Sequence, residues 1–203
     1  MASVYDLKPK FQNLLRPLCG ALAGAGVTAN QVTVAAALLS IALGAAIWAT
    51  KGAAWTLFLL PPLLLVRMAL NAIDGMLARE FGQKSRLGAI LNELGDVVSD
   101  TALYLPFAAI PGISAILVGL VIAIAVMTEV AGVVAIQIGG ARRYDGPFGK
   151  SDRAVWFGFL AVALAVGVPP GSDVVTAYLA FMAVAGIFTI INRSRAALKG
   201  GAP

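Results

Sequence analysis

The chain has 203 residues, of which 60% are hydrophobic and only 12% are charged, and it carries a formal net charge of +5. Soluble domains contain about 25% charged residues, so this composition indicates an integral membrane protein. The chain has no histidine and a single cysteine, Cys19, which excludes a Ser-His triad, a histidine-bound metal and an intrachain disulfide. No short apolar core followed by a small-residue cleavage site opens the chain, so we expect no cleaved signal peptide.

The first segment, Val4 to Cys19, places apolar residues at helical spacing with charged residues between them. This pattern predicts an amphipathic helix on the membrane surface, within a juxtamembrane segment over residues 1–28. The alternative is a polar tail whose periodicity arose by chance.

A membrane-spanning helix needs about 20 mostly apolar residues. Six stretches, the fifth of them short, predict an all-α integral membrane fold in which one domain, residues 1–203, contains a six-helix bundle over residues 29–192. The predicted transmembrane helices are Val32–Ala49, Ala53–Ala78, Leu87–Ile110, Ile113–Ile138, Ala154–Val168 and Val174–Ile191. Glycine and proline turn signals separate most of them.

Lysine and arginine residues gather on one side of this predicted topology. Of the 15, only Lys51 and Arg67 lie outside the N-terminal segment, the second-to-third loop, the fourth-to-fifth loop and the C-terminal tail. The positive-inside rule therefore places both termini and these two loops in the cytoplasm. We expect the protein to lie in the cell membrane of a bacterium or archaeon. The positive charge suits the anionic lipid bilayer and phosphate groups, and no motif indicates binding to nucleic acid.

Residues 71–100 contain the polar side chains that are costliest to place in a bilayer. A carboxylate at membrane depth costs roughly 2.5 to 3.5 kcal/mol, so these aspartates must face a cavity, a partner or a metal. Asn92, Asp96 and Asp100 recur every four residues and form a stripe about 12 Å long on one helical face. The preceding span carries a comparable stripe, formed by Arg67, Asn71, Asp74 and Ala78.

A short cytoplasmic loop joins these two spans, so we expect the polar stripes to meet near the cytoplasmic surface. Their ligands are oxygens only, which favours Mg²⁺, Mn²⁺ or Ca²⁺. Gly75 and Ala78 leave room for a bulky ligand, and Arg79 is suited to hold a phosphate. Three other interpretations stay open: a polar patch that pairs helices, a structural membrane subunit, and a transporter whose acidic pathway Glu129 and Gln137 would continue.

The spacing of the polar run resembles the signature of the CDP-alcohol phosphotransferase family, D-x-x-D-G-x-x-A-R-x8-G-x3-D-x3-D. The residues that match it in register are Asp74, Gly75, Ala78, Arg79, Gly88 and Asp96. The segment T-A-N-Q-V-T at residues 28–33 and the pair Gly149–Lys150 are similar to two further family segments.

The resemblance implies a phospholipid-synthesising enzyme with the fold predicted above. Such an enzyme transfers a phosphatidyl group from CDP-diacylglycerol, or a related CDP-alcohol, to the hydroxyl of a small acceptor alcohol and releases CMP, with one or two Mg²⁺ or Mn²⁺ ions as cofactor. By position, Asp96 is the general base, and the metal-site residues are Asn71, Asp74, Asn92 and Asp96, with Asp100 one turn beyond. The residues implied around the CDP-alcohol are Asn30, Thr33, Gly75, Ala78, Arg79 and Ser85.

The chain departs from the signature at Asn71 and Asn92, where the family has aspartates. An amide oxygen binds a hard cation but brings no negative charge, which weakens the binding of a second divalent ion. Asp100 and Glu93 are placed to restore some of that charge. Three outcomes stay open: catalysis with a rearranged or weaker metal set, an unusual substrate, or binding of the CDP-lipid without turnover.

The sequence leaves the acceptor alcohol open. Four basic residues near the predicted site are suited to bind the phosphate of an acceptor such as glycerol phosphate or inositol phosphate, although the positive-inside bias explains them equally well. They are Arg142, Arg143, Lys150 and Arg153. The resemblance also allows a homodimer, which nothing in the sequence demonstrates.

Overall fold

The computed structural model describes residues 4–200, with side chains over residues 11–199, and every regular element in that range is helical. The elements are α1 (Val4–Gly24), α2 (Ala29–Ala49), α3 (Ala54–Phe58), α4 (Leu60–Glu80), α5 (Arg86–Tyr104), the 3-10 helix η1 (Leu105–Ala109), α6 (Ala115–Gln137), α7 (Lys150–Ala165) and α8 (Asp173–Gly200). The prediction of an all-α fold is confirmed, and each predicted span overlaps one or two of these helices.

In the described part of the chain, four helical segments are long and apolar enough to cross a membrane. They are Ala29–Ala49, Ala54–Glu80, Ala115–Gln137 and Asp173–Lys199. These segments confirm an integral membrane protein. Helix α5 is more polar, since it carries Glu93, Asp96 and Asp100, and α7 has only 16 residues, so the count of six spans stays a prediction.

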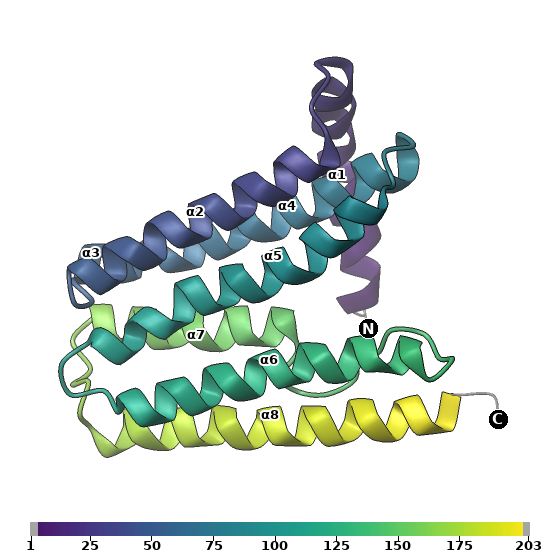
Figure 1. The fold of residues 1–203 in the computed structure, drawn as a ribbon. Coiled ribbons are helices and arrows are strands. Elements are labelled where there is room, and N and C mark those ends of the chain that lie inside the picture. The colour runs from purple at the N-terminus through teal and green to yellow at the C-terminus, as the bar shows by residue number, and fades with distance from the viewer. Residues whose placement is uncertain (1–3, 201–203) are drawn as a thin grey trace. The chain divides into compact units, whose positions relative to one another are not determined.

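The chain divides into two compact units, one made of residues 1–42 and 62–100 and the other of residues 43–61 and 101–203. In the first unit, α2, α4 and α5 run alongside one another and α1 crosses them (Figure 1). In the second unit, α6 packs along α8, α3 packs against α7, and η1 packs against α6. The prediction of one domain stays a prediction.

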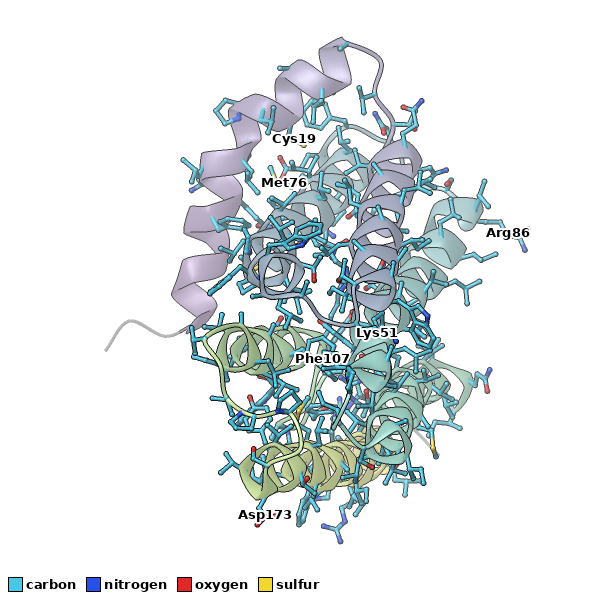
Figure 2. All side chains as sticks on the ribbon, turned by 90° about the vertical axis from the view of Figure 1, so that its left-hand side faces the viewer. Cys19, Lys51, Met76, Arg86, Phe107 and Asp173 are labelled. Atoms are coloured by element: carbon cyan, nitrogen blue, oxygen red, sulfur yellow. The ribbon has the colours of Figure 1, made fainter. Side chains whose placement is uncertain are left out.

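A buried apolar cluster joins α1 to α4 in the first unit. Cys19 of α1 is buried with Ile73 and Met76 of α4, and Figure 2 shows Cys19 and Met76 close together. Burying a large apolar side chain stabilises a fold by roughly 1.5 to 3 kcal/mol. Leu14 and Leu18 of α1 are 75% and 50% exposed, and the side chains of residues 4–10 lie outside the described ones. A helix on the membrane surface stays a prediction.

Local sequence determines where α2 and α5 begin. Thr28 and Gln31 form a capping box, in which the Gln31 amide donates to Thr28 Oγ1 at 3.2 Å and the Thr28 amide donates to Gln31 Oε1 at 2.9 Å. Ser85 caps α5, because its hydroxyl oxygen accepts a hydrogen bond from the Gly88 amide at 2.9 Å. Both starts carry residues of the predicted site.

The second unit is held together by aromatic stacking and by one very close helix approach. The Tyr104 ring stacks on the Phe157 ring with centroids 4.0 Å apart, and Phe107 packs edge-on against Phe157. A Cβ atom at Gly44 of α2 would lie 1.9 Å from the carbonyl oxygen of Ala102 of α5. Only glycine permits that approach of two backbones.

Candidate active site

Asp74 lies on α4 and is held from α2. Its carboxylate accepts a hydrogen bond from the Thr33 hydroxyl, with 2.8 Å between Oγ1 and Oδ2, and the residue is buried. The methyl group of Thr33 also lies 3.4 Å from the position of a Cβ at Gly95 on α5. Thr33 therefore contacts both helices that carry the polar stripes, at a point next to Asp96.

Arg67 of α4 reaches two acidic residues of α5. Its Nη1 atom lies 2.5 Å from Asp100 Oδ1, and its Nη2 atom donates to the backbone carbonyl of Asp96 at 3.2 Å. The same Nη2 lies 3.7 Å from Asp96 Oδ1, and the side chains of Arg67, Asp96 and Asp100 are only 4%, 15% and 7% exposed. Ion pairs and charge-assisted hydrogen bonds with so little water around them are strong, so Arg67 fixes α4 against α5 at Asp96.

The four signature positions for metal carry two carboxylates and two amides. Asp74 is buried, while Asn71, Asn92 and Asp96 are half-buried. All four offer hard oxygen donors, which fit Mg²⁺ or Mn²⁺. Over the residues with described side chains, no three His, Cys, Asp or Glu residues are grouped to hold a metal ion.

Polar side chains gather where α2 and α5 begin. A Cβ at Gly88 would lie 2.8 Å from Asn30 Oδ1 and 2.9 Å from Ser85 Oγ, so glycine lets both side chains approach the α5 backbone. Gln83, which the sequence analysis did not single out, accepts a hydrogen bond from the Ala29 amide at 2.7 Å. No spacing rule marks a glutamine in a short polar loop, and this one fastens the loop to the start of α2.

Arg79 folds back over Gly75, one helical turn earlier. A Cβ at Gly75 would lie 2.9 Å from Arg79 Nη2, so a larger residue there would displace the guanidinium group. Arg79 is exposed, whereas Ala78 packs against the apolar cluster beneath the helix. An exposed guanidinium group beside bare backbone is a suitable contact for a phosphate.

The four predicted acceptor-binding residues belong to the second unit, and two of them bind Glu129 of α6. Arg153 Nη2 lies 2.9 Å from Glu129 Oε1, and Arg142 Nη2 lies 3.0 Å from Glu129 Oε2. Arg193 of α8 is a third partner, with Nη1 3.5 Å from Oε2. These three ion pairs explain the buried Glu129 without a transport pathway.

The other two acceptor candidates are Arg143, in the loop between α6 and α7, and Lys150, directly after that loop. Arg143 Nε is 3.3 Å from Asp145 Oδ2, and the half-buried Lys150 is the first residue of α7. A phosphate-binding role for all four basic residues stays a prediction. The sequence analysis missed Glu129 as the centre of the cluster, because the ion pairs depend on how the loop after α6 folds back.

Residues 26–191 match the family described as CDP-alcohol phosphatidyltransferase. The chain therefore belongs to this family of transferases of substituted phosphate groups, which act in phospholipid biosynthesis, and the resemblance in the sequence is confirmed. Inner membrane protein YnbA of Escherichia coli strain K12 is 47% identical over 197 residues, which cover 97% of this chain and 96% of YnbA.

Two solved structures of phosphatidylinositol phosphate synthase (PgsA1) from Mycobacterium tuberculosis resemble this fold. The structure with CDP-DAG bound has a TM-score of 0.75 at 20% identity and covers 91% of this chain and 93% of PgsA1. The structure in complex with manganese and citrate has a TM-score of 0.74 at 20% identity, with coverage of 91% and 88%. At this identity the likeness shows the shared fold.

Proposed function

We propose that the protein transfers a phosphatidyl group from CDP-diacylglycerol, or a related CDP-alcohol, to the hydroxyl of a small acceptor alcohol and releases CMP. The observation that supports this best is the position of Thr33, which donates a hydrogen bond to Asp74 and packs against Gly95, the residue before Asp96. The two carboxylates that remain from the family signature therefore lie on helices that contact the same side chain. The binding of CDP-DAG by PgsA1, which has the same fold, supports the choice of donor.

In the proposed reaction, the acceptor oxygen forms a bond to the phosphorus of the phosphatidyl group. The bond from that phosphorus to the oxygen of CMP breaks, and CMP leaves with the electron pair. Asp96 accepts the proton of the acceptor hydroxyl. Arg79, folded over Gly75, holds the diphosphate, and Asn30, Thr33 and Ser85 contribute polar contacts to the cytidine end.

The residues that would hold a divalent cation are Asn71, Asp74, Asn92 and Asp96. A bound Mg²⁺ or Mn²⁺ would neutralise the diphosphate and stabilise the departing CMP. Thr33 would keep Asp74 oriented for this role, since its hydroxyl donates a hydrogen bond to Oδ2 at 2.8 Å.

A CMP-release assay tests the transfer reaction. Purified protein would be incubated with Mg²⁺ or Mn²⁺, labelled CDP-diacylglycerol and a panel of acceptor alcohols, with mass spectrometry of the lipid product. Asp96→Asn should lower the rate at least ~100-fold because the general base is lost, whereas the matched control Asp173→Asn, at the exposed start of α8, should not. The proposal fails if no acceptor gives CMP release and wild type equals Asp96→Asn.

The amides Asn71 and Asn92 favour a second candidate, a homologue that binds the CDP-lipid without turnover. In that case CDP with Mn²⁺ would raise the melting temperature and ADP with Mn²⁺ would not, while CMP release would be absent. Changing Asn71→Asp and Asn92→Asp together should then produce turnover. Turnover by wild type would rule this candidate out.

The acceptor is proposed to carry a phosphate that the basic residues of the second unit bind. Arg143→Ala and Lys150→Ala should each raise the KM for glycerol phosphate or inositol phosphate about 10-fold and leave the KM for the donor unchanged. The control is Lys199→Ala, which removes a positive charge near the end of α8. Unchanged acceptor KM values in both variants would refute a phosphate-bearing acceptor.

We also propose six spans with both termini and the loop before α5 in the cytoplasm, so that CMP leaves into water while the lipid stays in the membrane. Lys84→Cys and Ser172→Cys, in a Cys19→Ser background, test this with a membrane-impermeant maleimide on intact cells. Ser172→Cys should react and Lys84→Cys should not, and inverted vesicles should reverse the result. The opposite pattern would overturn the orientation.

A further inference from the structure

The two polar stripes contain a permanent positive charge, the guanidinium group of Arg67. It is 4% exposed, and its contacts reach two positions of α5 that are one helical turn apart. Buried arginines are rare, and such a charge requires a partner. Asp100 supplies it, at 2.5 Å from Nη1, so that pair is formally neutral.

The neutral pair changes the charge that the stripes offer to a metal. The stripes carry three aspartates and one arginine, so their formal charge is −2 once Arg67 is counted against Asp100. One divalent cation balances these charges. A second would add two uncompensated positive charges near a guanidinium group that already lies 3.7 Å from Asp96 Oδ1, and like charges repel strongly where water is scarce.

The second Nη atom of Arg67 gives the pair a role beyond neutrality. Nη2 donates to the Asp96 carbonyl at 3.2 Å and lies beside the Asp96 carboxylate. Arg67 thus contacts both the backbone and the side chain of the proposed base, while Asp100 holds the guanidinium group from the other side. A side chain held in this way keeps its orientation without help from water.

We infer that Arg67 is a positioning residue for Asp96. Its guanidinium group also places a permanent positive charge in the site, so that the site takes a single divalent metal ion. The inference rests on the proposed function, since it concerns the same carboxylates. It assigns Asp100 to Arg67 rather than to the metal. It also gives a physical reason why Asn71 and Asn92 are compatible with a working site, because one divalent ion needs fewer negative ligands.

The experiment is a titration of the full-length protein with Mn²⁺ alone, followed by the electron paramagnetic resonance signal of free Mn²⁺. The informative variant is Arg67→Gln/Asp100→Asn, which removes the positive and the negative charge of the pair together. Arg67→Lys keeps the charge but loses the two-pronged contact. Arg16→Gln/Glu80→Gln removes an exposed ion pair of the same kind, at 3.1 Å, and is the matched control.

Wild type should bind one Mn²⁺ per chain. Arg67→Gln/Asp100→Asn should also bind one, with a Kd raised about 10-fold because Asp96 is no longer held, and Arg67→Lys should lie between the two. The control should match wild type. In the turnover assay, the double variant should lose kcat and keep its KM for the donor, and Arg67→Lys should recover part of kcat.

Each part of the inference has a result that would overturn it. Two Mn²⁺ ions of similar affinity in wild type, or none, would refute the single-ion site. Mn²⁺ binding by Arg67→Gln/Asp100→Asn as tight as that of wild type would refute the positioning role. Failure of the proposed transfer function is a separate outcome, since it would show as absent CMP release while the Mn²⁺ titration still decides on Arg67.

Discussion

The Glu129 cluster allows the sharpest test of the second unit. Glu129→Gln keeps the size and one acceptor oxygen of the side chain but removes the carboxylate that contacts all three arginines. Two of them, Arg153 and Arg193, have side chains that are 2% exposed, so water cannot replace the lost charge. Removing one partner of a buried ion pair costs about 3 to 5 kcal/mol.

The expected cost lies near the lower end of that range, because the arginines keep other contacts. Arg153 still donates to Thr128 Oγ1 at 3.1 Å and to the Phe148 carbonyl at 3.2 Å. The glutamine oxygen can accept from one of the three arginines. We therefore expect Glu129→Gln to lower the free energy of unfolding by about 3 kcal/mol.

The assay is equilibrium unfolding in mixed micelles with increasing SDS, monitored by tryptophan fluorescence. Glu80→Gln is the control, since it breaks the Arg16–Glu80 pair, whose side chains are 53% and 39% exposed, and should cost less than about 1 kcal/mol. Adding Arg142→Gln to Glu129→Gln should recover part of the loss, because it removes one of the three positive charges that faced the carboxylate of Glu129. Equal stability of Glu129→Gln and Glu80→Gln would refute the reasoning.

Three further predictions address other parts of the molecule. Gly44→Ala should destabilise the protein by more than about 3 kcal/mol because its Cβ would lie 1.9 Å from a backbone carbonyl oxygen. The control is Gly119→Ala, on an open face of α6. Similar SDS unfolding midpoints for the two variants would contradict the close packing at Gly44. Thr33→Val should slow CMP release 10-fold or more, since a hydrogen bond to a charged group contributes about 1.5 to 3 kcal/mol. Thr33→Ser keeps the hydroxyl and should restore the rate of CMP release. Full activity of Thr33→Val would show that the hydrogen bond to Asp74 is dispensable. Burial raises the pKa of the Cys19 thiol, which lowers its thiolate fraction at about pH 8. Maleimide should therefore label Cys19 far more slowly in the native protein than in the SDS-unfolded protein. Equal labelling rates would disprove burial of Cys19.

Helical periodicity was enough to predict an all-helical chain, and the signature register supplied the residues of the candidate site, which stay a prediction. Asn92, Asp96 and Asp100 fall on one helical face whatever the neighbours are, because that follows from spacing alone. The partners of the charged side chains could not be predicted in the same way. Arg67 was seen only as a member of a stripe, and its choice of Asp100 depends on the rotation of α4 against α5. A shift of α5 by four residues along α4 would change which acidic side chain Arg67 faces.

The boundaries of the spans show the same limit. Hydropathy predicted the third span as Leu87–Ile110, whereas α5 ends at Tyr104 and η1 continues to Ala109. Pro106 lies at the start of η1, and proline cannot donate the backbone hydrogen bond that would extend an α-helix. Apolar composition continues through such a change of helix type, so a hydropathy scan cannot detect it.

The segment that matches the family is shorter than the segment that packs together in the first unit. The match to the family begins at residue 26, after the end of α1 at Gly24. Yet Cys19 of α1 lies in the same buried cluster as Ile73 and Met76, which flank Asp74 on α4. A chain trimmed to the family-matched segment would leave that side of α4 uncovered, directly behind a residue of the site. A segment that contains the whole family signature is therefore shorter than the segment needed to keep α4 packed in its native position.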